Sequence, residues 1–235
     1  MTSLPFLKMQ AQGNDFVVFD GRVAPLPELA AELMMRLADR REGVGCDQVL
    51  VLLPSEDADA RLRIFNQDGS EAGNCGNGLR CIGELLLSQS GKEEVSVLLP
   101  SRRVRIERGE GTIRVHMGLA RVVEESAAHV AIDIGNPHRV VFEATEDFPG
   151  DTNIEIVTGA TAEDIWIEII ERGVGRTLAC GSGACATALA VWHREGHHRP
   201  QRIHMPGGTV TVSGSPNDLV LEGSVAYVFR GELFL

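Results

Sequence analysis

Lysine is almost absent from this chain of 235 residues. Lys8 and Lys92 are the only two among 22 basic residues. Enzymes that use pyridoxal phosphate hold the cofactor through a lysine Schiff base, and neither lysine lies in a recognisable cofactor motif. The sequence therefore argues against pyridoxal chemistry, and we expect no cofactor.

The chain also lacks an excess of positive charge and long apolar runs. A formal net charge of -11 argues against nucleic acid as a partner, and the basic residues at 102–105 alternate as on one face of an exposed strand. No run approaches the roughly 18 apolar residues of a membrane span, and the first residues lack a secretory signal. We expect a cytoplasmic protein with a small-molecule substrate, and neither nucleic acid nor membrane as a partner.

The five cysteines lack the spacing of a zinc finger or ribbon. Cys75 and Cys81 lie six positions apart, and Cys180 and Cys185 lie five apart. An odd number of cysteines in a chain without a secretion signal is typical of thiols rather than of a disulfide framework. The sequence therefore predicts free thiols and no metal site.

What the chain does contain is a glycine-flanked cysteine that occurs twice, 105 residues apart. The two motifs are Cys75-Gly76-Asn77-Gly78 and Cys180-Gly181-Ser182-Gly183, and each opens an apolar stretch that predicts an enclosed helix, at 78–89 and 183–194. A thiol just before a helix faces unpaired N–H groups and the positive end of the dipole, which favour a thiolate and can bind a carboxylate.

A single intracellular cysteine is more often a small buried core residue than a reactive group. Duplication within glycine-rich helix openings reverses this preference for Cys75 and Cys180. Cys46, Cys81 and Cys185 lack that context and are predicted to be core residues.

Short β-type runs fill the rest of the chain and are mostly separated by hairpin-length turns. A third helix is predicted at 27–40, where apolar residues recur at helical spacing behind a first-turn proline. The sequence therefore predicts an α+β fold of two similar lobes, each a mostly antiparallel strand barrel wrapped around a central helix. A cleft between two such lobes is the expected site.

Two thiols on separate lobes suit one reaction in particular. Removal of an α-proton from an amino acid produces a carbanion that an ionised carboxylate stabilises poorly, so fixed N–H donors at the helix openings would have to stabilise it. Inversion then needs a base on one face and an acid on the other, and a thiolate with a thiol serves in both directions.

Polar motifs at strand ends fit a small polar substrate. Asparagine occurs in the segments 13–16, 65–70, 135–138 and 152–153. Turn chemistry explains any one of them, but four together favour binding. Glu171 and Arg172 could meet an ammonium and a carboxylate, or could form a surface ion pair.

Taken in order, these motifs resemble the diaminopimelate epimerase family. The resemblance rests on Gly-Asn-Asp-Phe-Val at 13–17, Gly-Cys-Asp-Gln at 45–48, the block 66–81, Gly-Asn-Pro-His at 135–138, Asn153, Glu-Arg-Gly at 171–173, and the block 179–186. It implies that Cys75 and Cys180 exchange protons on opposite faces of one stereocentre. The implied reaction interconverts LL- and meso-2,6-diaminopimelate for lysine and cell-wall synthesis.

The resemblance also implies the supporting residues. His138 and Glu171 would adjust the cysteine pKa values, since an imidazole and a carboxylate act on a thiol in opposite directions. The implied substrate contacts are Asn14, Gln48, Asn66, Gly76, Asn77, Asn136, Asn153, Glu171, Arg172, Gly181 and Ser182.

Family architecture sets the expected domains and assembly. The N-terminal lobe, with Cys75, would take residues 1–117 plus 224–235, and the C-terminal lobe, with Cys180, would take 118–223. A homodimer is implied. Three positions differ from what relatives commonly carry: Ser182 replaces a threonine, Arg176 a glutamate and Phe229 an interface tyrosine. These differences bear on loop closure and dimerisation more than on the reaction.

Two other functions remain open from the sequence. Another pyridoxal-independent racemase would use the same cysteines, but a monocarboxylic substrate would not need Arg172 together with several asparagines. A thiol redox or metal-binding module is the alternative from a different class, and bound zinc would favour it.

Overall fold

The computed structural model describes residues 3–23, 25–27, 30–143 and 150–234. The chain divides into two compact units, 1–113 with 225–235 and 114–224. The boundary thus falls inside the strand Ile113–Gly118, and the C-terminal strand belongs to the first unit. No helix in these described ranges is long and apolar enough to cross a membrane.

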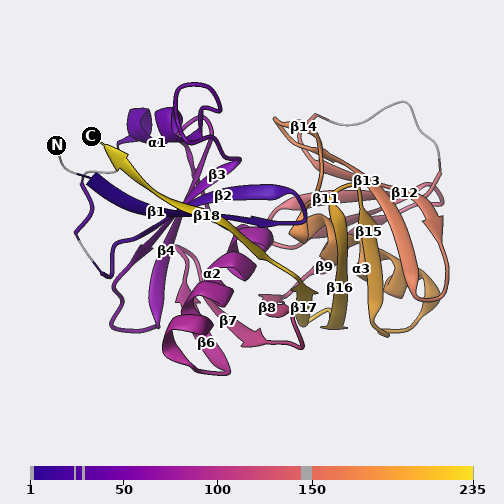
Figure 1. Ribbon diagram of the computed structural model, residues 1–235. Helices are drawn as coiled ribbons and strands as arrows, with labels where there is room; N and C mark the ends of the chain where they lie inside the picture. The colour runs from indigo at the N-terminus through magenta and orange to yellow at the C-terminus, as the bar shows by residue number, and fades with distance from the viewer. Residues whose placement is uncertain (1–2, 24, 28–29, 144–149, 235) are drawn as a thin grey trace. The chain divides into compact units, whose positions relative to one another are not determined.

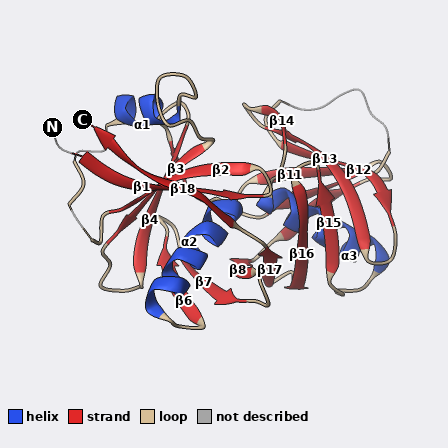
Figure 2. Cartoon of the chain, viewed as in Figure 1, coloured by secondary structure: helices blue, strands red, loops and turns tan. Residues whose placement is uncertain are grey.

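Unit 1 is built from strands around one long helix, as the strand and helix labels of Figures 1 and 2 show. The central helix α2, Gly76–Ser90, buries most of its side chains and packs on β1, β6 and β7. The other elements are β1 Ser3–Ala11, β2 Asn14–Asp20, α1 Ala31–Ala38, β3 Gln48–Leu53, β4 Ala60–Asn66, β5 Glu71–Ala72, β6 Glu94–Leu98, β7 Arg103–Arg108 and β18 Ala226–Phe234.

Unit 2 repeats this plan. Its helix α3, Gly181–Glu195, is buried along most of its length and packs against strands on several sides. The strands are β8 Ile113–Gly118, β9 Arg121–Glu125, β10 His129–Asp133, β11 Pro137–Val141, β12 Asn153–Ala160, β13 Asp164–Glu171, β14 Gly175–Thr177, β15 Gln201–Met205, β16 Gly208–Ser215 and β17 Asp218–Gly223.

Small residues let the two central helices lie close to their strands. At Gly83 in α2 an added Cβ would overlap the Ile106 side chain of β7. In α3 the alanines at alternate positions 184–190 are fully buried, and Trp192 fills the space at the end of the helix. The predicted enclosure of both helices is therefore confirmed, and so is the two-lobe α+β fold.

Pairing within the units is mostly antiparallel, with parallel pairs at equivalent places. β2 pairs parallel with β3, and β3 continues antiparallel into β4. In unit 2, β11 pairs parallel with β12, and β12 continues antiparallel into β13. This shared order, followed in each unit by the long helix, supports the internal duplication.

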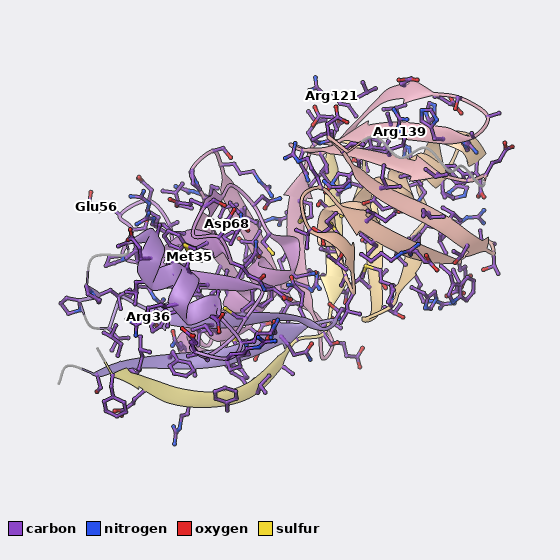
Figure 3. The ribbon with its side chains drawn as sticks, turned by 90° about the horizontal axis from the view of Figure 1, so that it is seen from above. Met35, Arg36, Glu56, Asp68, Arg121 and Arg139 are labelled. Carbon is purple, nitrogen blue, oxygen red and sulfur yellow. The ribbon has the colours of Figure 1, made fainter. Side chains whose placement is uncertain are left out.

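The predicted helix at 27–40 is wrong at both ends. Helix α1 begins at Ala31, because Ala30 has an extended backbone with a ψ of 148° and Pro27 lies outside the helix; residues 28–29 lie outside the described ranges. It ends at Ala38, where the Asp39 carboxylate accepts hydrogen bonds from two following N–H groups. Met35 and Arg36, labelled in Figure 3, occupy its exposed face.

Strand β1 was not predicted from the sequence, because Pro5 interrupts its alternating pattern. The pairing of β1 with β2 covers residues 7–11, so at Pro5 the strand pairs with β18 alone. The missing N–H of the proline is tolerated at such a position.

Candidate active site

Both motif cysteines cap the central helix of their unit. Cys75 and Cys180 have extended backbones, and their Sγ atoms accept hydrogen bonds from the N–H groups of Gly78 and Gly183, at 3.3 and 3.4 Å. Such a cap satisfies one of the helix's unpaired donors with the sulfur itself. The predicted placement of both thiols at helix openings is confirmed, with Gly76 and Gly181 as the first helical residues.

In unit 1 four predicted substrate residues form two hydrogen-bonded pairs of amides. Asn77, two positions after Cys75, donates to Asn14 Oδ1 at 3.3 Å. Gln48 and Asn66 are paired across β3 and β4, and the Gln48 amide donates to Asn66 Oδ1 at 2.9 Å. The four amides supply donors and acceptors of the kind that an amino acid needs.

A partly buried ion network holds the Asn14 turn in place. Asp15 forms an ion pair with Lys8 at 2.6 Å and another with Arg40 at 2.7 Å, while Asp47 accepts from the Asn14 amide at 2.8 Å. Burial alone would raise the pKa of Asp15, but its hydrogen bonds and attraction to Arg40 and Lys8 outweigh this and hold that pKa well below its usual range. The Asp15 carboxylate is therefore ionised at neutral pH and can hold both cations.

Arg80 is a residue that sequence reasoning passed over. It is fully buried in α2, and its guanidinium donates to Asn77 Oδ1 at 2.8 Å and to Gln12. Its place within an apolar helix was the available signal, because a charged side chain is rarely buried without partners. Arg80 fixes the amide of Asn77 beside Cys75.

In unit 2 the predicted residues lie at the ends of three neighbouring strands. His138 is paired with Asn153 across β11 and β12, and Asn153 Oδ1 accepts from the Arg172 N–H at 3.0 Å. The Asn153 amide donates to the Pro137 carbonyl at 3.2 Å. Asn153 therefore ties the end of β13, with Glu171 and Arg172, to the Gly-Asn-Pro-His turn.

Arg172 and Asn136 are the least constrained of the predicted contacts. The Arg172 side chain is exposed, reaches the Asp151 carbonyl at 3.5 Å, and forms no ion pair within the part of the chain that the structure describes. Among the described residues, the alternative of a surface ion pair for Glu171 and Arg172 is therefore not seen. Asn136 follows Gly135, whose φ of +90° suits glycine. The Asn136 carbonyl accepts a hydrogen bond from the Ile134 N–H.

Cys180 lies in a strongly acidic setting. Burial raises the pKa of the Cys180 thiol well above 9, and the nearby carboxylates of Glu171 and Glu155 raise it further. Ser182 Oγ lies 3.4 Å from its sulfur. Cys180 is accordingly a protonated thiol at neutral pH, which makes it suited to donate a proton.

Glu171 is shielded from solvent and contacts that thiol. Burial raises the pKa of Glu171, while hydrogen bonds from Thr177, at 2.7 Å, and Cys180 partly offset the rise. These two hydrogen bonds hold the Glu171 carboxylate against the Cys180 thiol.

The second carboxylate, Glu155, was not predicted. It is fully buried on β12, and its Oε1 lies 2.8 Å from His138 Nδ1. In the sequence Glu155 alternates with Ile154 and Ile156, which is typical of an outward-facing residue, and this pattern concealed it. Arg139, the next residue along β11, lies on the opposite face from His138, because side chains alternate along a strand.

The remaining three cysteines are core residues, as predicted. Cys46, Cys81 and Cys185 are fully buried, and none of the five cysteines forms a disulfide. Burial raises the pKa of Cys46 to about 11 and that of Cys81 to about 12. Within the described ranges no three His, Cys, Asp or Glu side chains are grouped so as to hold a metal ion.

The sequence matches the family described as "Diaminopimelate epimerase" over residues 6–123 and 139–228. The chain belongs to the diaminopimelate epimerase family. Both catalytic candidates and most predicted contacts lie inside the matched ranges, whereas Asn136 and His138 lie between them. Membership makes the protein an epimerase, and thus an isomerase.

Curated relatives agree over almost the whole length. The diaminopimelate epimerase of Rhizorhabdus wittichii is 38% identical over 263 residues, covering 97% of this chain and 94% of the relative. That of Acidiphilium cryptum is 38% identical over 267 residues, covering 97% and 96%.

Solved structures share the fold at low sequence identity. A PhzF-family phenazine biosynthesis protein from Bacillus anthracis has a TM-score of 0.74 at 17% identity, covering all of both chains. A hydroxyproline epimerase from Agrobacterium vitis, with bound trans-4-hydroxy-L-proline, has a TM-score of 0.71 at 13% identity and covers 99% of this chain and 91% of that one. At these identities the likeness concerns the fold alone.

Proposed function

We propose that this isomerase interconverts LL- and meso-2,6-diaminopimelate, with Cys75 and Cys180 as the two proton-transfer groups. The observation that carries the proposal is the duplicated cap, in which each unit presents one thiol at the opening of its buried central helix. The functional lobes are residues 1–117 with 224–235, and 118–223.

The proposed chemistry moves two protons and no other group. One cysteine, as a thiolate, takes the α-proton, and the electron pair of the broken C–H bond stays on the substrate. The other cysteine then gives its S–H proton to the opposite face of that carbon. Because burial and neighbouring carboxylates raise the pKa of Cys180, we assign Cys180 as the proton donor and Cys75 as the base in the first turnover, with the roles exchanged afterwards.

The helix openings support the charge that develops on the substrate. The first N–H groups of α2 and α3, at Gly76, Asn77, Gly181 and Ser182, are donors of the kind that stabilise an α-carboxylate as it gains charge. No cofactor takes part in this route.

Residues at the strand ends suit the distal half of diaminopimelate. Arg172 offers an exposed guanidinium that forms no ion pair with any described residue, and Asn66, Asn136 and Asn153 supply polar groups for a second carboxylate and ammonium. A racemase for a monocarboxylic amino acid would have no use for this set, which is why we favour diaminopimelate over proline or hydroxyproline.

Incubation with LL-diaminopimelate tests the proposal. Chromatography on a chiral phase should show meso product approaching equilibrium, with little or no racemisation of proline, hydroxyproline, glutamate or lysine under the same conditions. Activity should survive a chelator. Turnover of proline or hydroxyproline without turnover of diaminopimelate would instead assign a different racemase.

We further propose a cytoplasmic homodimer that uses β18. Tyr227, Val228 and Phe229 are consecutive and each is about half exposed, so β18 does not alternate between a buried and an exposed face. Phe229 also contacts Phe6 edge-on, with ring centroids 6.0 Å apart. A run of exposed apolar residues on one strand is typical of a protein interface.

Phe229→Glu should therefore produce a monomer, because it places a charge in the middle of this apolar run. Light scattering coupled to size-exclusion chromatography measures the mass. Val23→Glu is the matched control, since Val23 is an exposed apolar residue of the same unit away from β18, and should leave the dimer intact. A monomeric wild-type protein would contradict the proposed assembly.

A further inference from the structure

The two units differ at one pair of equivalent buried positions. In unit 1 the parallel pair of β2 and β3 aligns Phe16 with Gln48, and Leu50 lies two residues further along. In unit 2 the parallel pair of β11 and β12 aligns His138 with Asn153, and Glu155 lies two residues further along. Phe16 and Leu50 in one unit thus correspond to His138 and Glu155 in the other.

Helix packing supports the same correspondence. A Cβ added at Gly78, the last glycine of the first motif, would lie 3.2 Å from Leu50. A Cβ added at Gly183, the last glycine of the second motif, would overlap the Glu155 carboxylate and lie 3.0 Å from its Cδ. Leu50 and Glu155 therefore support the first turn of their respective helices from the same place.

A structural role does not explain a carboxylate there. Leu50 supports α2 without any charge, whereas burial of a carboxylate and an imidazole costs free energy that apolar side chains would not. His138 and Glu155 have side chains with no exposed surface. Their pairing is therefore better explained by the reaction than by stability.

The geometry defines what the carboxylate does to the imidazole. Glu155 Oε1 lies 2.8 Å from His138 Nδ1, and an ionised carboxylate can only accept a hydrogen bond. With Glu155 as the acceptor, Nδ1 carries the hydrogen of this pair, and Nε2 is the ring nitrogen that is available for a second partner. Nε2 is buried and has no hydrogen-bond partner among the described residues.

From this we propose that Glu155 is a positioning residue, which fixes the Nδ1–H tautomer of His138 and so leaves Nε2 to exchange a proton with Cys180, the reacting thiol of the same unit. The inference deepens the proposed function and rests on it. Glu155 also lies near Cys180, whose pKa its charge helps to raise, and this keeps the proton on the donor thiol.

Glu155→Gln is the informative substitution, because it keeps the size of the side chain and removes its charge. We expect kcat for diaminopimelate to fall roughly 100-fold, as for the loss of a well-placed acid or base, while KM changes less than about threefold. The ¹⁵N NMR signals of His138, assigned with a His138→Gln variant, should show loss of the pure Nδ1–H form. Glu168→Gln, an exposed carboxylate on β13, is the matched control and should retain the wild-type kcat.

A double variant separates function from folding. His138→Phe with Glu155→Leu reproduces the apolar pair of unit 1, so its melting temperature should equal or exceed that of the wild type, while its activity should be lost. A Glu155→Gln enzyme with near wild-type kcat, or a His138 ring that carries its hydrogen on Nε2 in the wild type, would overturn the assignment. An inactive wild type would instead defeat the proposed function, and the NMR measurement would still test the tautomer.

Discussion

Replacing either Cys75 or Cys180 by serine should lower the rate of epimerisation by at least about 1,000-fold, within the range attributed to a general acid or base. Serine nearly keeps the size of the thiol and its ability to accept the capping hydrogen bond, but its hydroxyl is a much weaker acid. The loss should therefore appear in kcat, with the fold intact by circular dichroism.

Cys81→Ala and Cys185→Ala provide controls on the same two helices. Both cysteines are fully buried and outside the motif, so these variants should lose some stability and keep most of their activity. Because proton removal and proton return are both required for inversion, each serine variant alone should be defective. Near-normal turnover in either serine variant would refute the two-thiol assignment.

Asp15→Asn is expected to have the largest effect on stability, lowering the free energy of unfolding by about 3 kcal/mol because it breaks a buried ion pair. The Lys8 side chain is only 9% exposed, and Asp15 is its only ion-pair partner among the described residues. Urea denaturation at pH 7 measures the change. The matched control is Glu71→Gln, which removes the half-exposed pair with Arg63 and should cost less than about 1 kcal/mol.

The sign of the pH dependence follows from the pKa of Asp15. Because the folded protein lowers that pKa, the stabilisation is fully present above the unfolded value of about 3.9 and is lost as the pH falls below it. The stability of the wild type should therefore decline more steeply than that of Asp15→Asn between pH 5 and pH 3. Parallel declines would show that the ion pair contributes little.

The sequence predicted the parts of this protein that depend on local patterns. The repeated Cys-Gly-X-Gly motif gave both helix openings to within two residues, since glycine and small residues mark close packing. The sequence did not predict β1. Its Pro5 is tolerated only because β2 pairs with β1 at residues 7–11 and leaves the proline free of that pairing. The sequence also did not predict that α1 begins at Ala31, because this start depends on the extended backbone of Ala30.

Buried polar residues were harder to predict than the thiols. Glu155 alternates with isoleucines as a solvent-facing residue would, but both faces of β12 are covered at that point. Arg80 lies in an apolar helix, where its burial depends on Gln12, which is distant in sequence. Such partners become visible only when register and packing bring separate segments together.

The most direct test of the central claim is deuterium labelling during the first few per cent of conversion. LL-Diaminopimelate is incubated with the enzyme in D₂O, and product and recovered substrate are examined by mass spectrometry. Two opposed thiols predict one deuterium at the inverted α-carbon of the meso product and almost none in the recovered substrate. Equal labelling of substrate and product would indicate a single base, and product without deuterium would contradict proton transfer through exchangeable thiols.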